Sequence, residues 1–408
     1  MVSLTPQSFP IGFEDFWGYT KDNVNPVNGN FLLQETDLAI PGRGVQVYIT
    51  RTYNSRKSNA TSMFGYGWTS NAEQLIKDSG SGPITYVDGD GTSHIFGEKE
   101  GGGYASVGSV HLELEKNADG TYTLKQKDGT KINFNSNGKL VSIVDKNGNT
   151  TGYGYDTNGS LTQITDASGR INTISYGANG KVASTTDSAN RTTSYEYDAA
   201  ADNLIKVTDQ EGKTITYAYN ADHNIIGITD ARNNITTIEY DTSDRVTKVN
   251  RPITINGTAA TSSTSYTYSS ATEVVDGEGN RVDYYYNLNG NITKIERNPN
   301  DASNKSVITL DYDNYNNLVQ LKDANNNKIG GNNTYIFTYD LKGNITGVQL
   351  PENQTTNYAY DNFSNLIRIE DFNNNVSSAD YDDGNNQTEA TDAKVQTKAK
   401  NAIIAKGI

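Results

Sequence analysis

The chain has 408 residues, a formal net charge of −14 at pH 7 and a sequence pI near 4.7. The acidic balance argues against nucleic-acid and anionic-lipid partners, because phosphate-rich surfaces are bound by basic faces. The lack of cysteine in the sequence excludes a disulfide scaffold and thiolate metal sites, and no run approaches the roughly 18 apolar residues of a membrane-spanning helix. The 27 tyrosines and 38 glycines, against 34% hydrophobic residues, favour thin buried layers between strands.

Residues 1–22 form an aromatic-rich segment that contains Phe9, Phe13, Phe16, Trp17 and Tyr19. The segment has neither the basic n-region nor the continuous apolar h-region of a secretory signal. We therefore expect a trimmed signal, another export route, or an internal fragment of a longer protein. A secreted or cell-surface location remains the expectation.

Residues 23–130 contain three patterns that could carry chemistry. Gly42-Arg43-Gly44 is not a phosphate loop, since no helical pattern follows it. Asp88-Gly89-Asp90-Gly91 resembles the start of a calcium loop but lacks the ligand at position five and the glutamate at position twelve, so a hairpin turn is favoured. His94, His111 and His223 are far apart in sequence, which predicts solvent-facing strand residues rather than zinc ligands.

An internal repeat of about 21 residues dominates the rest of the chain. One unit reads Tyr153-Gly154-Tyr155-Asp156, then Gly159, then Leu161 and Ile164, then Asp166 and Gly169. Most units are 21 or 22 residues long, a series that indicates an array of equivalent supersecondary units. The second aromatic residue of each unit marks its position: Phe134, Tyr155, Tyr176, Tyr197, Tyr219, Tyr240, Tyr268, Tyr286, Tyr312, Tyr339, Tyr360 and Tyr381.

The repeat predicts its own local structure. Tyr-x-Tyr alternates as a strand with one buried face does, and Asp-x-x-Gly is turn chemistry, in which Asp caps the turn and Gly supplies positive φ. Twelve units give on the order of 24 antiparallel strands of roughly six residues. Because strands twist by about 20° each, so long a sheet coils into a spiral with an inside and an outside. We expect the repeat tyrosines to stack as one ladder on the buried face.

Two rows of identical residues could be taken for functional sites. The tyrosines could form a sugar-binding platform, but mutual stacking in a regular array is favoured. The aspartates that follow the second strand could bind metal or act in catalysis, yet a site needs one distinct position and not a dozen alike, so turn capping is predicted. These aspartates are Asp145, Asp166, Asp187, Asp209, Asp230, Asp323 and Asp371. We predict no catalytic, cofactor-binding or metal-binding residues.

Three insertions lengthen the repeat, at Pro252–Thr264, Asn298–Lys305 and Asn325–Asn333. Their Asn, Ser, Thr and Gly content predicts loops at a hairpin end, on one rim, that tolerate shortening. Residues 389–408 form a Lys/Ala-rich tail. The final strand, near Tyr381, is then expected to expose an unpaired edge, which predicts self-association.

The residues resemble the Rhs/YD-repeat family, which includes bacterial polymorphic toxins, wall-associated proteins and the Tc-toxin C component. The repeats at 131–388 carry the resemblance, together with strings at Asn25–Phe31, Glu35–Gly44, Arg51–Ser55 and Phe64–Trp68, which look like the family's N-terminal module at 23–130. The resemblance implies an all-β shell that spirals around a polypeptide cargo. The family's Asp-Pro-x-Gly core signature does not occur near residue 408, so self-cleavage and toxin activity are not carried over.

The sequence therefore predicts a non-enzymatic scaffold: tandem β-hairpins in a long, spiralling antiparallel sheet that encloses or displays a cargo such as a toxin domain. The alternative is an extracellular adhesin that binds carbohydrate or protein through its outer face or its insertion loops. Clustered exposed aromatic residues would favour the adhesin, and a hollow lumen would favour the shell. An enzyme is the third and weakest reading.

Overall fold

The computed structural model describes residues 18–99, 103–106, 112–199, 203–323, 333–382 and 386–391. Within these ranges the fold is all-β, as predicted, and its helical content is two single turns of 3₁₀-helix, η1 (Ser55–Lys57) and η2 (Asn71–Glu73). No helix in the described ranges is long and apolar enough to cross a membrane.

The strands before the repeats are β1 (Leu32–Ile40), β2 (Val47–Asn54), β3 (Thr61–Ser62), β4 (Gly65–Tyr66), β5 (Trp68–Ser70), β6 (Leu75–Lys77), β7 (Ile84–Val87), β8 (Ser93–Glu98), β9 (Tyr104–Ser106), β10 (Glu113–Lys116) and β11 (Tyr122–Lys125). The first six repeat hairpins are β12 (Lys131–Phe134), β13 (Leu140–Val144), β14 (Thr150–Tyr155), β15 (Leu161–Thr165), β16 (Ile171–Tyr176), β17 (Val182–Thr186), β18 (Thr192–Tyr197), β19 (Leu204–Thr208), β20 (Thr214–Tyr219), β21 (Ile225–Thr229), β22 (Ile235–Tyr240) and β23 (Val246–Ile255). The last six are β24 (Thr258–Tyr268), β25 (Thr272–Val275), β26 (Arg281–Tyr286), β27 (Ile292–Arg297), β28 (Ser306–Tyr312), β29 (Leu318–Lys322), β30 (Thr334–Tyr339), β31 (Ile345–Gln349), β32 (Thr355–Tyr360), β33 (Leu366–Glu370), β34 (Val376–Tyr381) and β35 (Gln387–Thr391).

The 24 strands from β12 to β35 match the number that the repeat predicts. Each marker tyrosine ends the first strand of a hairpin, and in most hairpins the register shifts by one residue just before it, as between Gly154 and Tyr155 of β14. Such bulges bend a strand and increase its twist. The hairpin β24–β25 has a shorter turn and no shift, with Tyr268 opposite Thr272, which accounts for the short interval of 18 residues before Tyr286.

The predicted turn chemistry is confirmed in detail. The Asp166 carboxylate accepts hydrogen bonds from the backbone N–H groups of Ser168 (2.9 Å) and Arg170 (2.8 Å). The same pair of bonds recurs at Asp145, Asp187, Asp209, Asp230 and Asp371. At Asp323 the backbone N–H donates to the carbonyl of Asn333 (3.0 Å). Repetition of this one arrangement explains the aspartate row as a set of turn caps.

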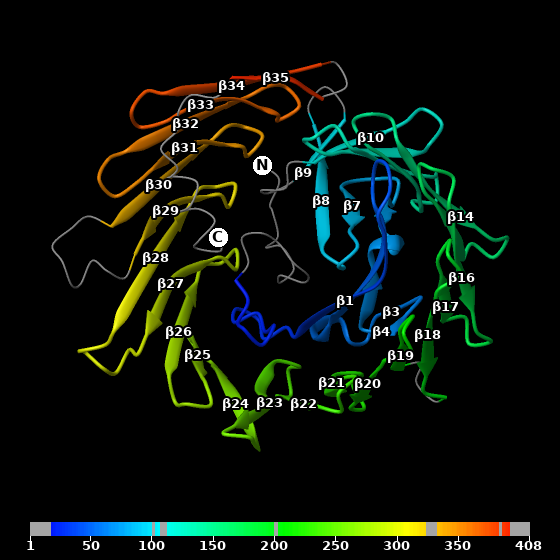
Figure 1. The fold of residues 1–408 in the computed structure, drawn as a ribbon, viewed down its shortest axis with the longest axis horizontal. Coiled ribbons are helices and arrows are strands. Elements are labelled where there is room, and N and C mark those ends of the chain that lie inside the picture. Colours follow the sequence, from blue (N-terminus) through cyan, green and yellow to red (C-terminus); the bar gives the residue numbers. More distant parts are fainter. Residues whose placement is uncertain are drawn as a thin grey trace.

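The strands β6 to β35 form one continuous antiparallel sheet that curves into a ring (Figure 1). The first strand of this sheet, β6, pairs with a later part of the same sheet through a bridge between Leu75 and Lys139. Strands β6 to β13 thereby enclose a separate apolar core that contains Phe96, Leu124 and Phe134. The sheet thus includes residues before 131. The expected boundary between an N-terminal module and the repeats, at residue 130, lies within this sheet, between β11 and β12.

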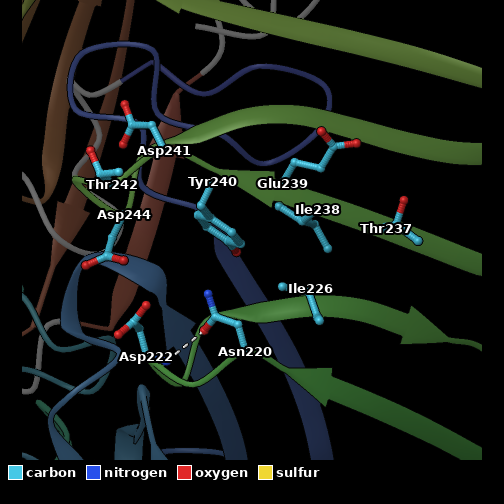
Figure 2. Close-up of a pocket in the computed structure, with 10 residues that line it drawn as sticks. All are labelled: Asn220, Asp222, Ile226, Thr237, Ile238, Glu239, Tyr240, Asp241, Thr242 and Asp244. Carbon is cyan, nitrogen blue, oxygen red and sulfur yellow. Dashed lines mark hydrogen bonds between the residues drawn. The ribbon is translucent and has the colours of Figure 1, made fainter.

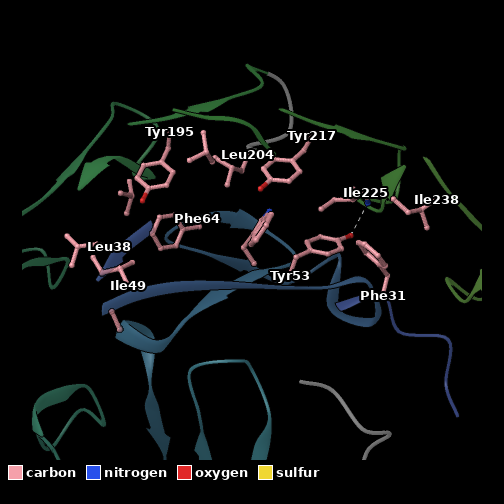
Figure 3. Packing of buried hydrophobic residues seen from close by; sticks show 14 of the residues in the cluster. Phe31, Leu38, Ile49, Tyr53, Phe64, Tyr195, Leu204, Tyr217, Ile225 and Ile238 are labelled. Atoms are coloured by element: carbon pink, nitrogen blue, oxygen red, sulfur yellow. Dashed lines mark hydrogen bonds between the residues drawn. The ribbon is translucent and has the colours of Figure 1, made fainter. Parts of the chain in front are cut away.

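The segment from Tyr19 to Glu73 lies inside the ring and forms what we call the plug, built around the three-stranded sheet β1-β2-β5 (Figure 1). Apolar residues of the plug and of β15 to β25 make a single buried core. In Figure 3, Phe64 of the plug faces Tyr195 of the wall, and Phe31 lies beside Ile225 and Ile238. The concave side of the wall is therefore filled over this arc by the chain's own polypeptide.

Two predictions about the insertions and the end of the array need correction. Pro252–Thr264 is not a loop: it extends β23 and β24 as a hairpin, with cross-strand pairs from Arg251 with Ser262 to Ile255 with Thr258.

The strand of Tyr381 is not the edge of the sheet, because β34 pairs with β35, which includes the first residues assigned to the tail. Asn298–Lys305 does form a turn between β27 and β28, whereas residues 325–332 and 392–408 lie outside the described ranges.

The histidine prediction is also wrong for His94. Its side chain is buried, stacks on Tyr86, and places Nε2 2.8 Å from Oδ2 of Asp88, so it closes the turn that the aspartate begins. His223 occupies a turn position with φ of 61° and stacks on Tyr66, with ring centroids 3.8 Å apart. His111 lies outside the described ranges.

Candidate functional site: the inner face of the wall

The marker tyrosines join neighbouring repeats through their hydroxyl groups. Tyr155 donates to the carbonyl of Leu140 (2.7 Å), which begins the second strand of the preceding hairpin. Each such bond contributes about 0.5–1.5 kcal/mol net. The same bond is made by Tyr176, Tyr197, Tyr219, Tyr240, Tyr268, Tyr312, Tyr339 and Tyr381 to Leu161, Val182, Leu204, Ile225, Val246, Ile292, Leu318 and Leu366 respectively.

The marker tyrosines do not stack on one another as the sequence predicts. Among the described residues no ring pair joins two marker tyrosines; hydroxyl-to-carbonyl bonds link the repeats instead. Tyr286 bonds Ser269 at 3.5 Å and is part-exposed, and Tyr360 is half-buried. The bulge explains the geometry, because it turns the ring at the end of the strand toward the neighbouring repeat.

Burial along the inner face falls from the first half of the wall to the second. The residue two positions before the marker is at most 5% exposed at Ile174, Tyr195, Tyr217, Ile238 and Tyr266. The equivalent residues Leu310, Phe337 and Tyr358 are only partly buried. Desolvation raises the pKa of Tyr219 and Tyr240 well above the ordinary value, whereas it raises the pKa of Tyr339 only to about 12.

The centre of the plug–wall contact is a buried ion pair. Arg51 of β2, with 1% of its side chain exposed, bonds the Asp37 carboxylate through Nε and through Nη2 (2.9 Å). The wall completes the site, because Tyr195 donates its hydroxyl to Asp37 (2.9 Å). The guanidinium carbon also lies 4.6 Å from the ring centroid of Trp68, a cation–π distance. A buried arginine held by carboxylate and rings fixes the plug in one position.

Glu73 fixes a second contact between plug and wall. Its Oε1 accepts from the backbone N–H of Met63 (2.8 Å), and the carbonyl of Met63 accepts from Val182 of the wall (2.9 Å). Burial raises the pKa of Glu73 to about 7, against a lesser lowering by its hydrogen bonds and Lys181. Its other oxygen, Oε2, is buried and has no hydrogen-bond partner among the described residues.

Residues at strand ends and turns of the wall also bond to the plug. Val246 N–H donates to Gly29 carbonyl (3.0 Å), and Ile225 N–H donates to the Tyr53 hydroxyl (3.1 Å), which itself donates to His223 carbonyl (2.9 Å). Bulges leave strand-end N–H groups without a ladder partner. The plug satisfies two of these groups, that of Val246 with a backbone carbonyl and that of Ile225 with a side-chain hydroxyl.

A hollow of about 600 Å³ opens beside the turns after β20 and β22 (Figure 2). Its lining is acidic, with Asp222, Glu239, Asp241 and Asp244, but the carboxylates of Asp241 and Asp244 are held by turn residues. No group of three or more metal-ligating side chains occurs within the described ranges. The hollow therefore offers capped turns and an open polar surface.

Two family models match the repeat array. Residues 134–171 match the model described as RHS Repeat, and residues 182–252 match the one described as Teneurin YD-shell. The repeat array of this chain is therefore of the Rhs/YD type. Residues 21–96, which include the plug and β6 to β8, match a domain of unknown function, DUF6531.

Curated relatives match 147 residues of this chain. It is 38% identical over 147 residues to the tRNA nuclease WapA of Bacillus subtilis strain 168 and 37% identical over 147 residues to the tRNA3(Ser)-specific nuclease WapA of Bacillus spizizenii. Each match covers 35% of this chain and 6% of the relative, so the chain spans a small part of those proteins.

Among solved structures, a crystal structure of TcdB2-TccC3-TEV is 12% identical with a TM-score of 0.44, and covers 88% of this chain and 24% of that chain. The Photorhabdus luminescens Tc holotoxin pore carrying TccC3-D651A gives a TM-score of 0.45 at 12% identity, with the same coverage.

Sequence reasoning located the repeat tyrosines but missed the groups that hold the plug, chiefly Arg51, Asp37 and Glu73. One signal for Arg51 was present. Arg51 lies within β2, which is buried along most of its length, and a charge inside a buried strand needs a partner. No local pattern reveals that Tyr195, 144 positions later, completes the site.

Proposed function

We propose that the chain is a non-enzymatic wall segment of a YD shell, with the plug as its internal support, and that the shell encloses or displays a polypeptide cargo. One observation carries the proposal: the concave side of a continuous 30-strand sheet already binds 55 residues of extended polypeptide, Tyr19 to Glu73 (Figure 1). The bonds are to backbone as well as side chains, which suits a surface that receives unlike sequences.

The names of the relatives suggest the kind of cargo. The WapA proteins are named as tRNA nucleases, and a toxin-type nuclease carried by such a shell would act outside the cell that makes it. We therefore propose a secreted or cell-surface location and assign any catalysis to the cargo. Self-association through the outer edge of β35, whose five residues are all exposed, stays a prediction.

A reporter fusion tests enclosure. A protease-sensitive reporter peptide with one site-specific cleavage sequence is fused after Ile408, and its cleavage rate is compared with that of the free reporter. The proposal expects cleavage several-fold slower than in the free peptide, and recovery of the free rate when Arg51→Ala loosens the plug. Cleavage at the free rate in the wild-type fusion would remove the support for enclosure.

A second candidate function is a protein-binding rim. The turns that close the hairpins β26–β27, β28–β29, β30–β31 and β32–β33 each carry a large exposed hydrophobic side chain: Leu288, Tyr315, Leu341 and Phe363. The equivalent turns before β23 carry small or polar residues instead. Clustered exposed apolar residues favour a contact surface. If the rim binds protein, the double substitution Leu341→Ser and Phe363→Ser abolishes surface retention in a cell-binding assay without changing the melting temperature.

A further inference from the structure

The plug contacts the wall in an order that runs against the chain. Moving back from Gly29, which bonds Val246 of β23, Asp22 pairs with Arg251 (2.6 Å) and Thr20 bonds the hydroxyl of Tyr266 in β24 (3.0 Å). At Gly18, a Cβ would lie 2.4 Å from Cδ1 of Ile292 in β27. Between Gly29 and Gly18 the contacts therefore pass from β23 to β27, although Asp22 still contacts β23 and Pro26 contacts Thr272 of β25.

Beyond β27 the inner face stays apolar but is less covered. At the start of the second strand of each hairpin, Leu161, Val182, Leu204, Ile225 and Val246 are at most 4% exposed. The equivalent residues Leu318, Ile345 and Leu366 are part-exposed, as are Leu310, Phe337 and Tyr358 on the facing strands. An apolar strip thus continues the surface that the plug buries in the first half.

Residues 9–17 have the composition and the length to cover this strip. They contain Phe9, Phe13, Phe16 and Trp17, and aromatic side chains bury large apolar areas. From residue 9 to Gly18 an extended chain reaches about 30 Å. The six strand spacings from β27 to β33 amount to about 29 Å. The two lengths agree.

We propose that residues 9–17 continue the plug as a belt and dock their aromatic side chains on the inner face of β27 to β33. The belt enters where Gly18 meets Ile292, so its attachment is fixed at one end and its effective concentration at the strip is high. Residues 9–17 are a better occupant of the strip than a second copy of the chain, because they come directly before Gly18, where the plug–wall interface reaches Ile292. The inference is independent of any cargo.

Tryptophan fluorescence tests the belt, because the chain has only two tryptophans. The substitution Trp68→Phe leaves Trp17 as the single emitter. A docked Trp17 emits at shorter wavelength than a solvated indole and is quenched by acrylamide several-fold less than a free peptide of residues 1–20. Circular dichroism confirms that the variant keeps its β structure.

A matched pair of wall substitutions locates the contact. Phe337→Asp, on the inner face of β30, should red-shift Trp17 and raise its quenching, whereas Ile336→Asp, on the exposed neighbouring position, should leave both unchanged. Leu310→Ser gives the same readout as Phe337→Asp if the latter unfolds the chain. Three results overturn the proposal: free-peptide quenching of Trp17, equal responses to both substitutions, or loss of protection on dilution, which would make a second copy the occupant.

Discussion

The two arcs of the wall have the same repeat and different surroundings. From β15 to β25 the inner face packs on the plug, and Ile174, Tyr195 and Ile238 are almost fully buried. From β28 to β33 the equivalent residues Leu310, Phe337 and Tyr358 are part-exposed, although the hairpin registers are the same. The repeat alone therefore specifies the sheet, while burial of its inner face depends on a second layer.

The difference shows what stabilises such an array. Hydroxyl bonds of the marker tyrosines join repeats in both arcs, so nearest-neighbour coupling is shared. Burial of apolar surface, which stabilises by about 25 cal/mol per Å², is greater in the first arc than in the second. We expect the first arc to be the more stable one, and the predictions below run from the largest expected effect to the smallest.

Loss of the buried arginine should weaken the first arc most. Arg51→Ala leaves the Asp37 carboxylate buried without its partner, which costs about 3–5 kcal/mol. The matched control is Arg368→Ala in β33, an exposed ion pair with Glu370, for which under about 1 kcal/mol is expected. Denaturant unfolding measures both, and equal losses would contradict the asymmetry.

Truncation of equivalent tyrosines compares the arcs directly. Tyr197→Ala removes a ring that packs against the plug core and should cost roughly 3 kcal/mol. Tyr360→Ala removes a half-buried ring outside the core that Tyr19–Glu73 forms with the wall and should cost about 1 kcal/mol. Thermal and denaturant melts of the two variants decide, and a change within 0.5 kcal/mol at Tyr197, roughly the surface-substitution level, would mean that the plug does not cover it.

The plug should also confer a pH dependence on stability. Folding raises the pKa of Glu73 from 4.5 to about 7, so the folded state holds its proton more tightly than the unfolded chain does. The contribution of Glu73 to stability is then greatest below pH 4.5, falls by about 3 kcal/mol as pH rises from about 4.5 to about 7, and is constant above that. Glu73→Gln should flatten this part of the unfolding profile, and an unchanged profile would assign the titration elsewhere.

Shortening the extended hairpin should have the smallest effect. Residues 252 to 258 are exposed throughout, and the hairpin tip pairs only with itself. Removing cross-strand partners together, Ile253 with Ala260 and Thr254 with Ala259, should change the unfolding free energy by under about 0.5 kcal/mol. A larger loss would show that the tip contacts the wall.

The repeat made much of the fold readable from sequence. The spacing of Tyr155, Tyr176 and Tyr197 and the turn aspartates specify strand number and hairpin register, because both signals are local. The extended hairpin could also have been recognised: Asn256-Gly257 has the two positive φ angles, 50° and 81°, of the common two-residue hairpin turn. The loop-like composition of the insertion obscured it.

The plug could not be predicted, because its contacts join residues far apart in the chain. Asp37 meets Tyr195, and Tyr53 meets Ile225, across more than 150 positions. His94 was misassigned for a related reason: its alternating strand position does not reveal that the Asp88 turn folds back over it. Local periodicity places a residue on a face but does not say what covers that face.

Hydrogen exchange of wild-type protein and Arg51→Ala, followed peptide by peptide, tests the central claim that the plug supports the first arc. The account predicts slower exchange in β15 to β23 than in β29 to β33 of the wild type, and faster exchange in β15 to β23 alone when Arg51 is replaced. Equal protection of the two arcs in the wild type, or equal loss in both when Arg51 is replaced, would contradict it.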